Sequence, residues 1–116
     1  MIKIINIKSK EPFDIFIGRN FKTPYEHFGN PWTHKSRANA IKVSSREEAV
    51  DNYRKWLYGE DFLDIESKRR EWILKNIHTL KDKTCACFCK PLSCHGDILK
   101  KFFEEKMPCS SIEGAF

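Results

Sequence analysis

The sequence predicts a small α/β domain with a short, mostly parallel sheet of about three to four strands, packed by three main helices as a two-layer or three-layer sandwich. Apolar runs at residues 2–7, 13–17 and 84–89 have the two-residue period of strands. Stretches with the helical period lie between the second and third runs and after the third. The longer of these leaves room for a right-handed crossover between parallel strands.

Chain length and composition set the class of protein. The 116 residues suit a single domain over 1–106, and residues 107–116 are expected to form a flexible C-terminal tail. No apolar run approaches the roughly 18 residues that cross a bilayer, so no membrane partner is expected. The five cysteines are an odd number, which favours free thiols in a reducing compartment. We therefore expect a cytoplasmic protein.

Capping signals and spacing place the three helices. Ser45 begins the first, with Glu48 completing a capping box, and Gly59 stops it. The others are expected over about 65–80 and 94–106. Their inward-facing residues are Ala49, Val50, Tyr53, Trp56 and Leu57 in the first, Ile65, Trp72, Ile73, Ile77 and Leu80 in the second, and Ile98, Leu99, Phe102 and Phe103 in the third. Residues 21–40 have no clear period and are predicted to form an irregular loop.

The candidate site is a cluster of cysteines and a histidine where the third strand gives way to the last helix. Residues 85–97 hold four of the five cysteines and one of the four histidines. Strand–helix loops are where α/β proteins place reactive and ligand-binding groups. Alternation along a strand puts Cys85, Cys87 and Cys89 on one face. We expect Cys85 to belong to the core and Cys89, at the strand end, to be accessible.

The opening turn of the last helix carries the candidate catalytic residues Cys94, His95 and Asp97. Ser93 or Cys94 would be the N-cap. The helix dipole is expected to lower the pKa of the Cys94 thiol, and the free amides offer an anion site that Gly96 lets a ligand approach. In the alternative, Asp97 only complements the dipole and His95 makes a local hydrogen bond.

Two chemistries suit this cluster. In the first, no metal is present, and Cys94 or Cys89 acts as a nucleophile or polar contact beside His95, with His27 or His34 as possible bases. In the second, zinc is bound by Cys87, Cys89, Cys94 and His95. The spacing of these ligands differs from the usual two-residue knuckle, so we expect no metal cofactor and keep zinc as the alternative.

Four landmarks give the chain a resemblance to a known family. They are Ile17-Gly18-Arg19, Gly29-Asn30-Pro31-Trp32, Arg46-Glu47-Glu48-Ala49-Val50 with Tyr53 and Leu57, and the string Cys87 to Leu99 with its Cys-x-Cys-x-Pro-x-x-Cys-His-Gly-Asp pattern. Together they resemble domain-of-unknown-function family 4326, small α/β proteins of bacteriophages, bacteria and large viruses. The resemblance runs from about residue 15 to 103. It supports the site and implies no established reaction.

If the second and third strands are parallel, these landmarks converge on one edge of the sheet. The expected ligand-binding residues are Gly18, Arg19, Asn30, Trp32, Cys89, Ser93 and Gly96. A net charge of +5 permits an anionic partner, and arginine binds phosphate well. We therefore expect a nucleotide-like or other phosphorylated ligand, and the sequence leaves open whether a reaction follows. The alternatives are a zinc-stabilised binding module and a nucleic-acid-binding domain that stacks bases on an exposed Trp32 or Phe28.

Overall fold

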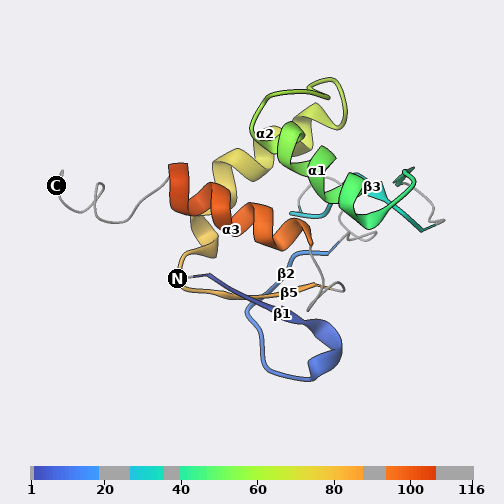
Figure 1. The fold of residues 1–116 in the computed structure, drawn as a ribbon. Coiled ribbons are helices and arrows are strands. Elements are labelled where there is room, and N and C mark those ends of the chain that lie inside the picture. The colour runs from blue at the N-terminus through green and yellow to red at the C-terminus, as the bar shows by residue number, and fades with distance from the viewer. Residues whose placement is uncertain (1, 19–26, 36–39, 88–93, 107–116) are drawn as a thin grey trace, which may run out of the picture.

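The domain is built on a three-stranded parallel sheet, and α1 (Arg46–Leu57), α2 (Ser67–Asn76) and α3 (His95–Lys106) lie on one side of it (Figure 1). The computed structural model describes residues 2–18, 27–35, 40–87 and 94–106. The strands are β1 (Lys3–Asn6), β2 (Ile15–Phe16) and β5 (Thr84–Cys87), in the order β1-β5-β2. The predicted α/β class is confirmed. The expected C-terminal tail, 107–116, lies outside the described residues.

The central strand, β5, pairs in parallel with both neighbours. Cys85 lies opposite Ile4 of β1 and Ile15 of β2. Residues paired in this way share a face, and this face joins the core beneath the helices. The connection from β1 to β2 includes a 3-10 turn over Ile7–Ser9 and runs on the other side of the sheet (Figure 1). The expectation that the second and third strands are parallel is confirmed.

A second, smaller sheet corrects the prediction for residues 21–40. In it β3 (Trp32–Thr33) pairs in parallel with β4 (Ile41–Lys42). The irregular loop predicted there is therefore wrong for Trp32–Thr33, while 21–26 and 36–39 lie outside the described residues. Strands of two residues are too short to show an alternating pattern, so periodicity could not predict this sheet.

Helix α1 (Arg46–Leu57) begins and ends as its capping residues predict. The Ser45 hydroxyl accepts a hydrogen bond from the Glu48 amide at 3.1 Å. The Glu48 carboxylate reaches back to the Ser44 amide at 3.0 Å, one residue earlier than a standard capping box. Gly59, just past the helix, has the left-handed φ of +80° that glycine tolerates best.

The other two helices differ in how well their ends were predicted. Helix α3 (His95–Lys106) starts one residue later than expected. Helix α2 spans only Ser67–Asn76, and a 3-10 segment continues it over Ile77–Leu80. The start is displaced because Glu66 takes a left-handed conformation, with φ of 40°. The Ile65 carbonyl instead accepts a hydrogen bond from the Trp56 indole at 2.7 Å.

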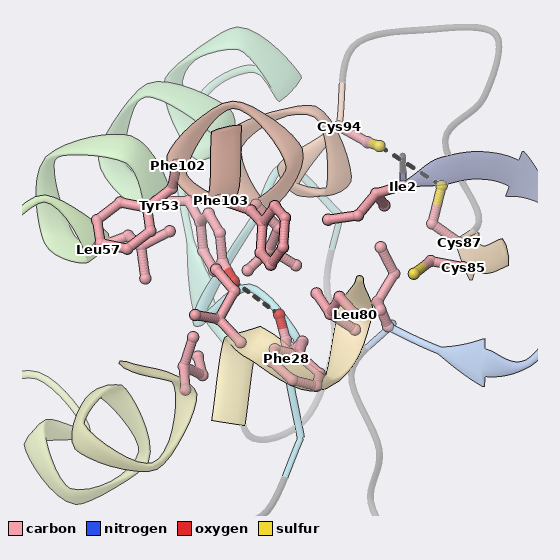
Figure 2. Close-up of a cluster of buried hydrophobic side chains, with 14 of the residues drawn as sticks. Ile2, Phe28, Tyr53, Leu57, Leu80, Cys85, Cys87, Cys94, Phe102 and Phe103 are labelled. Atoms are coloured by element: carbon pink, nitrogen blue, oxygen red, sulfur yellow. Dashed lines mark hydrogen bonds between the residues drawn. The ribbon is translucent and has the colours of Figure 1, made fainter. Parts of the chain in front are cut away.

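The core lies between the sheet and the helices, where side chains from all of these elements meet (Figure 2). It contains Ile2, Ile17, Phe28, Trp32, Ala49, Tyr53, Trp56, Leu57, Ile73, Ile77, Leu80, Cys85, Cys87, Cys94, Leu99, Phe102 and Phe103. Cys85 is fully buried, as expected. None of the described helices is long and apolar enough to cross a membrane.

Candidate functional site

His95 joins the start of α3 to the end of β2. Its Nε2 lies 2.5 Å from the Ile17 carbonyl oxygen. Because a carbonyl only accepts hydrogen bonds, Nε2 carries the proton and donates it. The ring also meets the Tyr53 ring edge-on, with centroids 5.2 Å apart. Ile17, which directly follows β2, therefore meets the start of the last helix. The predicted convergence of Gly18-Arg19 with the cysteine–histidine turn stays a prediction, because Arg19 and residues 88–93 lie outside the described residues.

The surroundings of His95 keep it neutral. Burial and, to a smaller extent, the nearby Arg69 guanidinium lower the pKa of His95. Together with the opposing effects of the Ile17 carbonyl and Asp97, they bring this pKa to about 4. A charged imidazolium at this position is therefore unavailable near neutral pH. The hydrogen bond to Ile17 matches the local role that the sequence offered as the alternative to acid–base catalysis.

Cys94 does not have the lowered pKa expected at a helix N-terminus. The Cys94 sulfur lies 3.5 Å from the Cys87 sulfur, and both side chains are fully buried. This hydrogen bond and burial raise the pKa of the Cys94 thiol. Desolvation and a neighbouring thiol thus outweigh the helix dipole, because both disfavour the thiolate. The expected lowering of the Cys94 pKa is therefore wrong for this arrangement, and a catalytic role for Cys94 stays a prediction.

Asp97 and Gly96 fix the first turn of α3 against the sheet. The Asp97 carboxylate accepts a hydrogen bond from the Cys94 amide at 3.3 Å, which occupies one of the amides proposed for an anion. A Cβ at Gly96 would lie 2.8 Å from the Ile17 δ-methyl and 3.1 Å from an Ile4 methyl. This glycine therefore permits a close approach between helix and sheet, and its expected role beside a ligand stays a prediction.

Gly18 has the same kind of constraint at the end of β2. A Cβ there would fall 2.3 Å from the tip of the Phe16 ring. The ring of Phe16 thus folds over Gly18, and a larger side chain at this position would require the ring to move. A role in contacting a ligand stays a prediction.

Asn30 and Trp32 serve the fold. The Asn30 amide nitrogen donates to the Ala49 carbonyl, and its oxygen accepts from the Trp32 amide, both at 3.0 Å. Trp32 is only 5% exposed and packs against Trp56. Phe28, the other aromatic considered for base stacking, is also buried. The proposed stacking of bases on exposed Trp32 or Phe28 is therefore wrong.

Arg69 is a buried cation that the sequence analysis missed. Its side chain is 1% exposed. The Nε donates to the Glu66 carboxylate at 2.8 Å, and Nη1 donates to the His27 carbonyl at 3.0 Å. The guanidinium also lies over the Trp56 ring, 5.2 Å from its centroid. Its Nη2 has no hydrogen-bond partner within the described part of the chain.

Arg69 belongs to a group of four buried polar side chains, His27, Tyr53, Arg69 and His95, which we call the buried polar cluster. Tyr53 donates its hydroxyl proton to the Phe28 carbonyl at 2.8 Å (Figure 2). Burial raises the pKa of Tyr53, so the hydroxyl stays protonated, while Arg69 acts electrostatically on both Tyr53 and His95. The cluster connects α1, α2 and the start of α3 beside the carboxyl end of β2.

The zinc alternative is only partly assembled by the described residues. Cys87 and Cys94 come together, but the protonated His95 Nε2 is engaged by the Ile17 carbonyl. Within residues 2–18, 27–35, 40–87 and 94–106, no group of three or more metal-binding side chains occurs. Cys89 and Ser93 lie outside these ranges.

Comparison with known proteins gives a family and no relative of known activity. The family described as Domain of unknown function (DUF4326) matches residues 4–105. No curated protein and no solved structure matches the chain.

Proposed function

Because the chain belongs to the family Domain of unknown function (DUF4326), we propose a function from its own geometry, namely that it binds a small phosphorylated or nucleotide-like anion at the buried polar cluster. The observation that carries this proposal is the Nη2 of Arg69, which is buried with no acceptor among the described residues. Natural proteins leave few such groups unsatisfied, and an unseen ion or water commonly explains them.

The hydrogen-bond count of Arg69 favours an oxygen-rich ligand. A guanidinium has five N–H groups. One is used by Glu66 and one by the His27 carbonyl, which leaves three, and two of these are on Nη2, the nitrogen that has no acceptor among the described residues. Leaving a buried donor unsatisfied costs about 1–3 kcal/mol, and more when it is charged. Phosphate oxygens match the planar donors of arginine and would remove this cost.

The charges around Arg69 favour an anion over water. The Arg69 guanidinium lowers the pKa of His95 and acts on Tyr53 in the same direction, so its positive potential extends through the buried polar cluster. Glu66, its ion-pair partner, is 29% exposed, so solvent weakens the neutralisation that it provides. A bound anion would lower the electrostatic cost of burying the arginine.

The position of the cluster agrees with this assignment. In parallel α/β sheets, ligands bind beside the carboxyl ends of the strands. His95 connects the cluster to the carboxyl end of β2 through Ile17. Arg19 follows two residues later in the sequence and is proposed as a second cation for the same ligand.

The test is ligand-induced stabilisation of the full chain. Inorganic phosphate, pyrophosphate and nucleoside mono-, di- and triphosphates are added in turn, and the melting temperature is followed. A ligand at about 100 times its Kd stabilises a protein by about 2.7 kcal/mol, which gives a shift of several degrees. The proposal requires at least one of these anions to raise the melting temperature and to move the NMR signals of His95. If none does, it is refuted.

Two variants of α2 with the same change in charge locate the site. Arg69→Gln should abolish the ligand-induced shift, whereas Lys68→Gln, on the exposed face of the same helix, should retain it. Arg69→Gln is also expected to lower the melting temperature without ligand, so only the difference with and without the anion is compared. Equal shifts in the two variants would contradict a site at Arg69.

A further inference from the structure

Cys87 and Cys94 form a buried pair of thiols that take no part in the proposed anion site. Cys87 ends β5 and Cys94 immediately precedes α3. Their sulfurs lie 3.5 Å apart, as the dashed line in Figure 2 marks. Both side chains have no exposed surface. The pair thus links the end of the central strand to the start of the helix that carries His95.

We propose that Cys87 and Cys94 are a redox modification site, which a small hydroperoxide converts into an intramolecular disulfide. A disulfide bond is about 2.05 Å long, so the sulfurs must approach by about 1.5 Å, a shift that side-chain rotation and a small movement of α3 can share. The proposal uses only the geometry of these two residues and does not depend on anion binding.

The oxidation balances with hydrogen peroxide as the two-electron oxidant. One thiol loses its proton, and the thiolate attacks a peroxide oxygen, which gives a sulfenic acid and releases water. The second sulfur then attacks the sulfenic sulfur, forming the S–S bond and releasing a second water. Two thiols are oxidised and one peroxide is reduced. A small oxidant is required because full burial excludes larger disulfide reagents from both sulfurs.

The surroundings explain why the pair stays reduced until it is challenged. The shared hydrogen bond and burial raise the pKa of Cys94, so little thiolate exists at neutral pH. Because the thiolate is the reactive form, oxidation should be slow near neutral pH and faster in alkaline solution. In a reducing compartment, disulfides of this kind are transient and act in sensing or catalysis.

Two matched variants test the pair. One keeps only Cys87 and Cys94, with Cys85→Ala, Cys89→Ala and Cys109→Ala. The other keeps only Cys85 and Cys94, with Cys87→Ala in place of Cys85→Ala. Cys85 lies two residues earlier on the same strand and is equally buried, so the variants differ in which thiol can meet Cys94. Circular dichroism establishes that both are folded before oxidation.

After treatment with hydrogen peroxide, we expect both thiols of the first variant to disappear and its mass to fall by two hydrogens. Dithiothreitol should reverse both changes. The second should keep its thiols or gain oxygen without a crosslink. The inference is overturned if the first variant gains oxygen instead, if both variants behave alike, or if the purified first variant holds one zinc per chain. In the wild type, alkylation in denaturant followed by peptide mapping should leave Cys87 and Cys94 unlabelled after peroxide treatment and labelled without it, which keeps the test valid if a variant does not fold.

Discussion

Lowering the pH from about 7 to about 5 is expected to destabilise the protein by about 2 kcal/mol through His95 alone. Burial holds the pKa of His95 at about 4 in the folded state, against about 6.5 when unfolded. The unfolded chain therefore takes up a proton first as the pH falls. The stability from neutral His95 is fully present above about pH 6.5 and is lost as the pH falls toward 4. The full loss approaches about 3 kcal/mol, since one pKa unit corresponds to about 1.4 kcal/mol.

Urea unfolding of the wild type and of His95→Gln at both pH values isolates this contribution. The glutamine amide can still donate to the Ile17 carbonyl but does not titrate. The charged groups that act on His95 are Arg69 of α2 and Asp97 of α3, and both remain in the variant. We expect the variant to lose about 2 kcal/mol less than the wild type over this range. Equal losses, or an NMR titration of His95 at about pH 6.5, would refute the reasoning.

Two further substitutions test the packing of this region. Gly96→Ala should lower the stability by about 1–2 kcal/mol, because the new methyl would lie 2.8 Å from an Ile17 methyl and overpacking outweighs the gain in helix propensity. The control is Lys101→Ala, on the exposed face of α3. Thermal unfolding should show a loss of stability for the glycine variant and none for the lysine variant. Tyr53→Phe should lower the stability by about 1–3 kcal/mol, because it leaves a buried carbonyl without its donor. The hydroxyl of Tyr58 instead donates to an exposed carboxylate, so Tyr58→Phe should lower the stability less when both variants are unfolded in urea. A stable Gly96→Ala or equal losses for the two tyrosines would contradict this account.

Local patterns predicted the elements that position the site. The alternation before Asn6 and at Ile15, and the capping residues Ser45 and Gly59, mark features that the chain forms near those positions. Parallel pairing also followed from the sequence, because the long connection into β5 leaves room for helices. The meeting of Ile17 with the start of α3 is a consequence of that pairing.

The properties of individual site residues depend on contacts between distant segments, which local patterns do not show. The raised pKa of Cys94 needs the neighbouring sulfur of Cys87 as well as burial. Arg69 did leave a signal: it lies four residues after Ile65 and four before Ile73, on the predicted inward face of α2. The charge of an arginine favours an exposed position, whereas the helical spacing of this one favours the inward face.

The order of strands in the sheet also constrains when the protein can fold. The middle strand, β5, is the last of the strands that the structure describes, and β1 and β2 are joined only through it. Lys3 can therefore pair within the sheet only once Thr84 is in place beside it. Closing so long a loop is slow compared with forming local helices. On the ribosome, β1 and β2 would emerge as unpaired edges, and the sheet would assemble only after β5 has been synthesised.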